Sequence, residues 1–130
     1  MDNLPALTAV ARGRCAEQMA AQWLRLCRMQ ILDRNRRAAD GEVDLVARDG
    51  QTLVFVEVRA RREGALVGPA ASIDAAKWRR LLNCARALSR EPALRWPGRT
   101  MRLDAVLIDL ASSGLRLRHL RNLRGPATYR

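Results

Sequence analysis

The sequence predicts a single α/β or α+β domain, in which a β-sheet is flanked by at least two helices. Apolar residues recur with helical spacing, then with strand spacing, and then in the same two patterns again, so the elements follow as helix, strands, helix, strands. The chain has 130 residues, enough for one hydrophobic core and too few for two ordinary domains. Hydrophobic residues make up 48% and charged residues 28%, a balance typical of folded chains.

The first helix is predicted between about Arg12 and Met29. Its apolar residues fall on one helical face: Ala16, Ala20, Trp23, Leu24 and Cys27. An extended segment follows from Ile31, and the pair Asp40-Gly41 is typical of a turn. We therefore expect a hairpin at Asp40-Gly41.

Two strands are predicted on either side of a turn at Asp49-Gly50. From Glu42 to Arg48 the pattern alternates, with Val43, Leu45 and Ala47 on one face and Glu42, Asp44 and Val46 on the other. The segment from Thr52 to Ala60 is apolar on both faces, as in a central strand that is covered on both sides.

A second helix should begin at Ser72 as its cap and end before Pro92. Its apolar stripe comprises Trp78, Leu81, Leu82, Ala85 and Leu88. Two further strands are expected over 101–110 and 115–120, joined by a turn at 111–114. The domain is thus expected to cover residues 1–120, with residues 121–130 as a basic tail.

The charge points to a polyanionic partner. Lys and Arg number 24 against 13 Asp and Glu, a formal net charge of +11, and almost all of the positive charge is arginine. Arginine matches phosphate geometry, so nucleic acid is the favoured partner, bound in a salt-sensitive manner. A ribosome-associated surface or a generally basic proteome is the alternative. Aromatic residues are 4% of the chain, too few for a surface that stacks single-stranded bases.

The cysteines and the apolar runs exclude other classes of protein. Cys15, Cys27 and Cys84 are odd in number and form no CxxC pair, which argues against a disulfide framework or structural zinc and favours small core residues in a reducing cytoplasm. No apolar run approaches the roughly 20 residues that a bilayer span requires. We therefore expect a cytoplasmic protein without a membrane partner.

Glu57 is the most informative residue of the predicted sheet, because it lies inside a run that otherwise looks fully buried. Burying a carboxylate is costly unless a cation or hydrogen-bond donors compensate it. A turn centred between Gly50 and Gln51 would place Asp44 directly opposite Glu57. Two adjacent carboxylates with room for water and phosphate suit Mg²⁺. A structural salt bridge from Glu57 to a nearby arginine is the alternative.

Several segments together resemble the YraN family of bacterial endonuclease-like proteins. They are Arg14-Cys-Ala-Glu17, Ile31-Leu-Asp-Arg-Asn35, Gly41-Glu-Val-Asp-Leu45, Phe55-Val-Glu-Val-Arg59-Ala-Arg61, Lys77 in a helix, and Arg102-Leu-Asp-Ala-Val106. The family is similar to archaeal Holliday-junction resolvases. The resemblance implies the restriction-endonuclease-like PD-(D/E)xK fold, with a central mixed sheet and helices on both sides.

The resemblance also implies roles for individual residues. Asp44 and Glu57 would bind Mg²⁺ or Mn²⁺, with the Val58 carbonyl as a further ligand and Glu17 approaching from the first helix. Nucleases of this superfamily usually have lysine where this chain has Arg59. Arginine stays protonated, so it can stabilise charge but cannot act as a general base.

Lys77 is a candidate to replace the missing lysine by pointing back from the second helix, the alternative being a solvated lysine. His119 has no partner histidine in the sequence, and we expect no function for it.

Three functions follow in order of preference. The first is a metal-dependent endonuclease that acts on DNA rather than RNA. Branched DNA is one candidate substrate, and its symmetric cleavage would require a homodimer. Arginines outside the centre would bind flanking phosphates, namely Arg34, Arg36, Arg37, Arg61 and Arg62. The second is an accessory protein that binds nucleic acid without cleaving it, and the third is a protein-interaction module.

Overall fold

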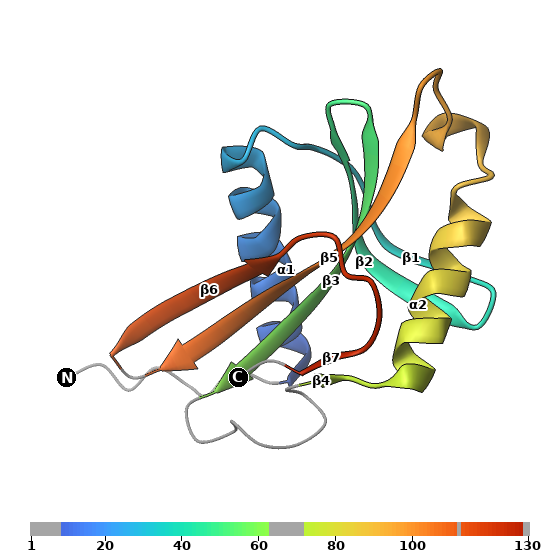
Figure 1. Cartoon of the computed structure of the whole chain (residues 1–130). Coiled ribbons are helices and arrows are strands. Elements are labelled where there is room, and N and C mark those ends of the chain that lie inside the picture. Colours follow the sequence, from blue (N-terminus) through green and yellow to red (C-terminus); the bar gives the residue numbers. More distant parts are fainter. Residues whose placement is uncertain (1–8, 63–71, 112, 129–130) are drawn as a thin grey trace.

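Two helices and a five-stranded sheet form most of the computed structural model, which describes residues 9–62, 72–111 and 113–128 (Figure 1). The elements are α1 (Ala9–Leu26), β1 (Gln30–Ala38), β2 (Gly41–Asp49), β3 (Thr52–Arg62), β4 (Ser72–Ile73), α2 (Ala75–Leu88), the 3₁₀ turn η2 (Pro92–Leu94), β5 (Thr100–Ala111), β6 (Gly114–Leu120) and β7 (Ala127–Thr128). The order of helix, strands, helix and strands is as predicted.

The sheet has the strand order β1-β2-β3-β5-β6. Neighbours are antiparallel except for β3 and β5, which run parallel in a continuous register from Thr52↔Thr100 to Arg62↔Leu110. The connection between these parallel strands carries α2, as a parallel crossover requires. The predicted α/β class is confirmed, and the sheet is mixed.

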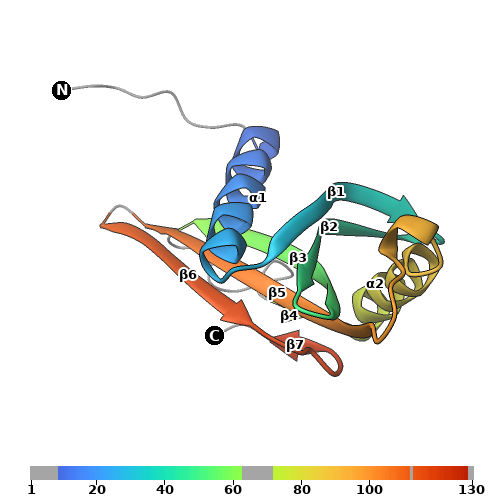
Figure 2. The same cartoon turned by 90° about the horizontal axis from the view of Figure 1, so that it is seen from above.

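The two helices cover opposite faces of this sheet (Figure 2). On one face α1 buries Ala16, Ala20, Ala21 and Leu24 against apolar residues of β2, β3 and β5. On the other face α2 buries Leu81, Cys84, Ala85 and Leu88 around Phe55. This three-layer arrangement explains why β3 is apolar on both faces.

The β2–β3 hairpin has the predicted register as far as its last pair, Leu45↔Val56. Its two-residue turn is Gly50-Gln51, and Gly50 has a φ of 61°, which glycine adopts without steric cost. The β1–β2 hairpin turns one residue earlier than expected, at Ala39-Asp40, so Gly41 is already the first residue of β2.

The predicted alternation along β2 is wrong at Val43. Leu45 packs on the α1 side, whereas Val43 joins Val46 on the α2 side. The β1–β2 hairpin is irregular at this point, because Asn35 in β1 has a left-handed φ of 50°. Asp44 therefore lies where the strand changes the face that it buries.

The cap of α2 is Asp74, which corrects the prediction of Ser72. The Asp74 carboxylate accepts a hydrogen bond from the Lys77 amide at 2.8 Å, while Ser72 belongs to β4 and pairs with Thr128 of β7. Before β7, the Leu123 amide donates to the Leu103 carbonyl at 2.6 Å, and the Leu123 side chain packs beside Trp78. Residues 121–128, expected as a basic tail, thus run back along the domain.

The three cysteines differ in burial, and the described helices are short or polar. Cys84 is buried and Cys27 partly buried, but Cys15 is exposed, so the expectation of a core position is wrong for Cys15. No helix within the described residues combines the length and apolar character that spanning a membrane requires.

Candidate active site

The candidate site lies where β2 and β3 separate. Beyond the pair Leu45↔Val56, β2 remains paired with β1, whereas β3 continues to Arg62 beside β5. Figure 1 shows these two parts of the sheet running apart. At the point of separation the Asp44 carboxylate accepts a hydrogen bond from the Val58 amide at 2.7 Å. The Asp44 side chain thereby satisfies a backbone donor that strand pairing would otherwise satisfy.

Glu57 is buried at the same point, with 5% of the residue exposed. The Lys77 ammonium lies 3.0 Å from its Oε1 atom, and the Arg59 guanidinium lies 3.5 Å from the same oxygen. Lys77 reaches the site from the first turn of α2, and Arg59 from β3 itself. The structure thus brings together all four residues that the sequence nominated for catalysis: Asp44, Glu57, Arg59 and Lys77.

Burial raises the pKa of Asp44 to about 8, and the negative charge of Glu57 adds to this effect. The Val58 amide acts in the opposite direction, because it stabilises the ionised carboxylate. Glu17 and Glu42 raise the pKa further by repulsion. A cation placed beside Asp44 would relieve all of these unfavourable interactions.

A pocket of about 510 Å³ opens over the two carboxylates, between the β1–β2 hairpin and α2. Its acidic lining residues are Asp40, Glu42, Asp44 and Glu57, and its basic lining residues are Arg37, Lys77 and Arg80. A pocket that combines carboxylates with cations can receive a metal ion together with an anion such as phosphate.

The oxygens of this pocket suit a hard divalent cation. Asp44 contacts the Val58 amide through Oδ2, and Glu57 contacts Lys77 and Arg59 through Oε1. The amide and carbonyl of a strand residue point to the same side, so the Val58 carbonyl faces the gap that its amide faces. Two carboxylates and one carbonyl would then form the ligand set.

Glu17 does not complete this set in the structure. Within residues 9–62, 72–111 and 113–128, no group of three or more His, Cys, Asp and Glu side chains is arranged to hold a metal ion. Glu17 is half-buried on α1 and acts on Asp44 through its charge.

The arginines expected to bind phosphate differ in their surroundings. Arg61 is buried and forms an ion pair with Asp109, and Arg36 bonds to Asp33 and Glu91. Arg34 donates to Gln18 at 2.8 Å. The Arg37 side chain is 82% exposed beside the pocket, with Glu42 3.6 Å away. The side chain of Arg62 lies outside the described residues. Arg37 is therefore the best placed of the five for a phosphate.

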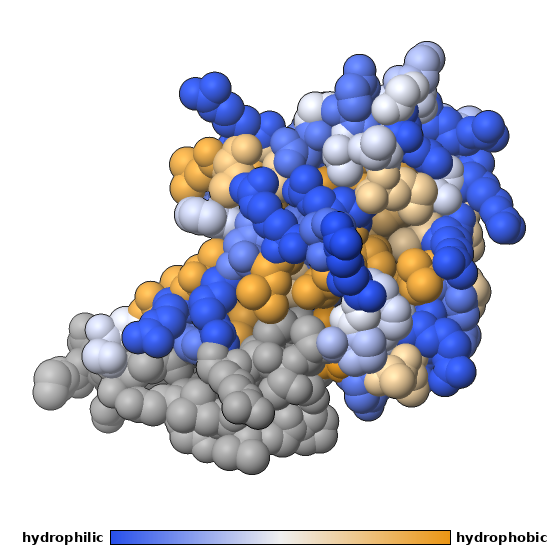
Figure 3. All heavy atoms as spheres, viewed as in Figure 1, coloured by the Kyte–Doolittle hydropathy of each residue, from blue (hydrophilic) through white to orange (hydrophobic). Residues whose placement is uncertain are grey.

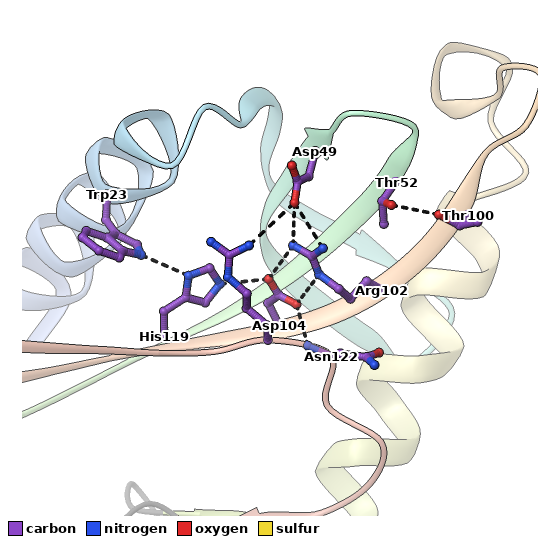
Figure 4. A network of polar contacts seen from close by, with 9 residues as sticks. Trp23, Asp49, Thr52, Thr100, Arg102, Asp104, His119 and Asn122 are labelled. Atoms are coloured by element: carbon purple, nitrogen blue, oxygen red, sulfur yellow. Dashed lines mark hydrogen bonds and ion pairs between the residues drawn. The ribbon is translucent and has the colours of Figure 1, made fainter.

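A second polar cluster, which the sequence patterns did not predict, lies on the α1 side of the sheet (Figure 4). Asp104 is fully buried, and its carboxylate contacts Arg102, the Asn122 amide and the His119 ring at 2.9–3.1 Å. Trp23 of α1 donates its indole N–H to Nδ1 of His119 at 3.0 Å. Because an indole can only donate, Nε2 of His119 carries the proton and donates to Asp104. An aspartate within an apolar strand was the available signal, the same one that identified Glu57.

Comparisons with known proteins place the chain in a family. The model of the "Uncharacterised protein family UPF0102" matches residues 16–108. The chain belongs to the UPF0102 family, which is the YraN family that the sequence resembles.

Relatives in this family come from several bacteria. A UPF0102 protein of Anaeromyxobacter dehalogenans is 42% identical over 111 residues, covering 84% of this chain and 80% of the relative. A UPF0102 protein of Arthrobacter sp. is 41% identical, covering 85% and 93%. One of Pseudomonas aeruginosa is 44% identical over 98 residues, covering 75% and 78%. The region that the family model matches contains the second half of α1, both carboxylates and Lys77.

Proposed function

We propose that this UPF0102 protein is a divalent-metal-dependent nuclease of the PD-(D/E)xK type that cleaves DNA. The observation that carries the proposal is the meeting of Asp44, Glu57 and Lys77 in one pocket where β2 and β3 separate. Two carboxylates at a partly buried site, beside a lysine and an arginine, are a combination that suits phosphodiester hydrolysis. The PD-(D/E)xK fold and Mg²⁺ or Mn²⁺ as cofactor are parts of this proposal.

In the proposed reaction Asp44, Glu57 and the Val58 carbonyl hold the ion, which supplies Lewis-acid stabilisation and an activated water. Arg59, fixed on β3 next to Glu57, stabilises negative charge that develops on the phosphate. Lys77 can do the same and, unlike arginine, can also exchange a proton with the attacking water or the leaving group. Arg37 and Arg80 at the pocket bind the neighbouring phosphates.

The charge of the surface supports a nucleic-acid substrate. Exposed arginines lie on α2 and just after it, among them Arg80, Arg86 and Arg90. Figure 3 shows hydrophilic side chains along the right-hand side of the molecule, where α2 lies in Figure 1. A duplex that lies across the pocket would therefore meet arginine beyond the site as well as within it.

The test is cleavage of branched, nicked and single-stranded DNA by the purified protein with Mn²⁺. We expect nicked or shortened products from at least one substrate, and their loss with chelator, with Glu57→Ala and with Lys77→Met. An Arg79→Met variant, which also loses one exposed positive charge on α2, should retain activity. Absence of cleavage on every substrate, or equal activity of Glu57→Ala, would refute the nuclease.

An accessory protein that binds DNA without cleaving it is the second candidate. The ion pairs of Glu57 with Lys77 and Arg59 favour it, because this carboxylate is compensated without a metal. This function predicts salt-dependent DNA binding that is unchanged by chelator and by Asp44→Ala.

A further inference from the structure

Lys77 and Arg59 share one oxygen of Glu57 but differ in their freedom to leave it. Arg59 belongs to the central strand β3, and its side chain is 15% exposed. Lys77 reaches Glu57 by a flexible four-carbon stem from the first turn of α2, and its side chain is 34% exposed, toward the pocket. Movement of the ammonium into the pocket requires only side-chain rotation, because the helix cap uses the Lys77 backbone amide and not the side chain.

We infer that Lys77 is an exchangeable counter-ion of Glu57, which a divalent metal ion displaces and which then binds the phosphate of the substrate. This inference rests on the proposed nuclease and adds the order of events at its site. Lys77 opposes metal binding while the pocket holds no phosphate, and it promotes metal binding once a phosphate is there. Metal and DNA therefore bind cooperatively.

Electrostatics is the physical reason for the displacement. A divalent ion held by Glu57 and Asp44 would stand within a few ångströms of an ammonium that is 3.0 Å from Glu57. At the effective dielectric constant of a half-buried site, repulsion between these charges is strong at such a short distance. The Lys77 ammonium reduces this repulsion by rotating away, whereas Arg59 stays beside Glu57 because both residues belong to β3.

The pocket offers the displaced ammonium a new partner when DNA is bound. Arg37 and Arg80 line the same pocket as Lys77, so a phosphate between them lies within reach of the flexible stem. Asp40 and Glu42 also line the pocket and would oppose a phosphate that arrives without a metal ion. Each ligand thus improves the site for the other, which is a reciprocal coupling of two binding free energies.

The experiment is calorimetric titration with Mn²⁺ of the wild type, Lys77→Met and Arg79→Met, without DNA and at one ionic strength. We expect the affinity of Lys77→Met for Mn²⁺ to be at least about tenfold higher than that of the wild type. Arg79→Met removes one positive charge from the same helix without touching Glu57, so it should change the affinity less than twofold. Thermal unfolding of each variant establishes that it is folded.

A second titration uses a short duplex with phosphorothioate linkages, which resists cleavage. This duplex should tighten Mn²⁺ binding to the wild type several-fold more than binding to Lys77→Met. Unchanged or weaker Mn²⁺ binding by Lys77→Met, or an equal gain in Arg79→Met, would overturn the counter-ion role.

Failure of the nuclease proposal gives a different result. If the wild type binds Mn²⁺ and Asp44→Ala does not, the metal site stands whatever Lys77→Met does. If no variant binds Mn²⁺, with or without the duplex, the metal site and the counter-ion are both refuted.

Discussion

Asp44 is a carboxyl group whose ionisation opposes folding. Its pKa is about 8 in the folded chain, against 3.8 for an ordinary aspartate, because it is buried beside Glu57. Between these values the native state binds more protons than the unfolded state, so the free energy of unfolding decreases as pH rises from about 4 to 8. Asp44→Asn mimics the protonated group and keeps an acceptor for the Val58 amide.

We therefore predict that Asp44→Asn is more stable than the wild type at pH 8 in the presence of chelator. The advantage should shrink toward pH 4, with a slope of at most about 1.4 kcal/mol per pH unit. Urea unfolding of both proteins at several pH values measures this difference in the free energy of unfolding. Parallel curves for the two proteins would contradict a raised pKa at this position.

Gly41 is required by the close approach of the β1–β2 hairpin to α2. A Cβ atom at Gly41 would lie 2.2 Å from the Arg80 carbonyl oxygen, a backbone atom that cannot rotate away. Gly41→Ala should therefore lower the free energy of unfolding by about 1–3 kcal/mol. It should also widen the pocket, because Arg80 lines it.

Gly13→Ala is the matched control for this prediction. A Cβ atom at Gly13 would meet no atom within 4 Å, and the residue lies inside α1, so alanine should stabilise the chain by about 0.5–1 kcal/mol. Urea unfolding of the two variants compares opposite signs for the same chemical change. A neutral Gly41→Ala would show that the hairpin and α2 can separate without cost.

Single residues were predicted well where a charge interrupts an apolar strand. Glu57 was recognised in this way, and its partner Asp44 followed from the length of the turn between them. Asp104 carries the same signal, but spacing indicates only its strand neighbour Arg102, because its partners His119 and Asn122 come from other parts of the chain. Sequence spacing indicates neighbours along a strand or across a short hairpin, and it does not indicate neighbours across a sheet.

At the scale of elements, the cluster around Asp104 joins β5, β6 and α1. Burial alone would raise the pKa of Asp104, but hydrogen bonds from His119, Arg102 and the Asn122 amide lower it overall. The ionised carboxylate therefore stabilises the folded chain above pH 3.8, and this contribution is lost as pH falls through the lowered pKa.

We predict that Asp104→Asn lowers the free energy of unfolding at pH 7 by about 3 kcal/mol, because Arg102 loses a buried counter-charge and His119 loses a charged acceptor for its hydrogen bond. Asp49→Asn is the control. Asp49 contacts Arg102 at 3.2 Å, but its side chain is 31% exposed, so its loss should cost less than about 1 kcal/mol. Chemical unfolding of both variants decides between these values, and equal losses would contradict the special role of the buried carboxylate.

Element types could be predicted because apolar periodicity reports directly which face of a segment is buried. Element boundaries were less predictable. The cap moved from Ser72 to Asp74 because Ser72 pairs with β7, a strand more than fifty residues away. The alternation of β2 failed at Val43, next to the point where Asn35 of β1 adopts a left-handed backbone conformation.

At the scale of the whole molecule, the segment 121–128 secures the start of α2. Leu123, like Trp78 of α2, packs against the buried clusters around Phe55 and around Ile73, while β7 pairs with β4 directly before the helix. Leu123→Ala should therefore lower the free energy of unfolding by about 1–3 kcal/mol.

Leu115→Ala serves as the control, since Leu115 is 50% exposed and its loss should cost at most about 0.5 kcal/mol. Thermal unfolding of the two variants provides the comparison. Similar melting temperatures would mean that residues 121–128 contribute little to the fold.

The packing of residues 121–128 against the domain could not be predicted, because Leu123 is the one large apolar residue of this segment and gives no apolar pattern. The partners of the arginines could not be predicted from composition either. Composition gave a net charge of +11, but it could not show that Arg36 and Arg61 bond to acidic residues of the domain while Arg37 is exposed at the pocket.

The separation of β2 from β3 has a mechanical consequence. Within the described residues, strand pairing joins the β1–β2 ribbon to the rest of the sheet from Leu45 to Asp49, opposite Thr52 to Val56. Beyond this segment the β1–β2 ribbon packs against α2, whereas β3 pairs with β5 and packs against α1. The width of the pocket is therefore set by the angle between two ribbons that diverge from one short hinge. A small change of twist in that hinge would alter the distance between Asp44 on one ribbon and Glu57 on the other, and with it the size of the cation that fits between them.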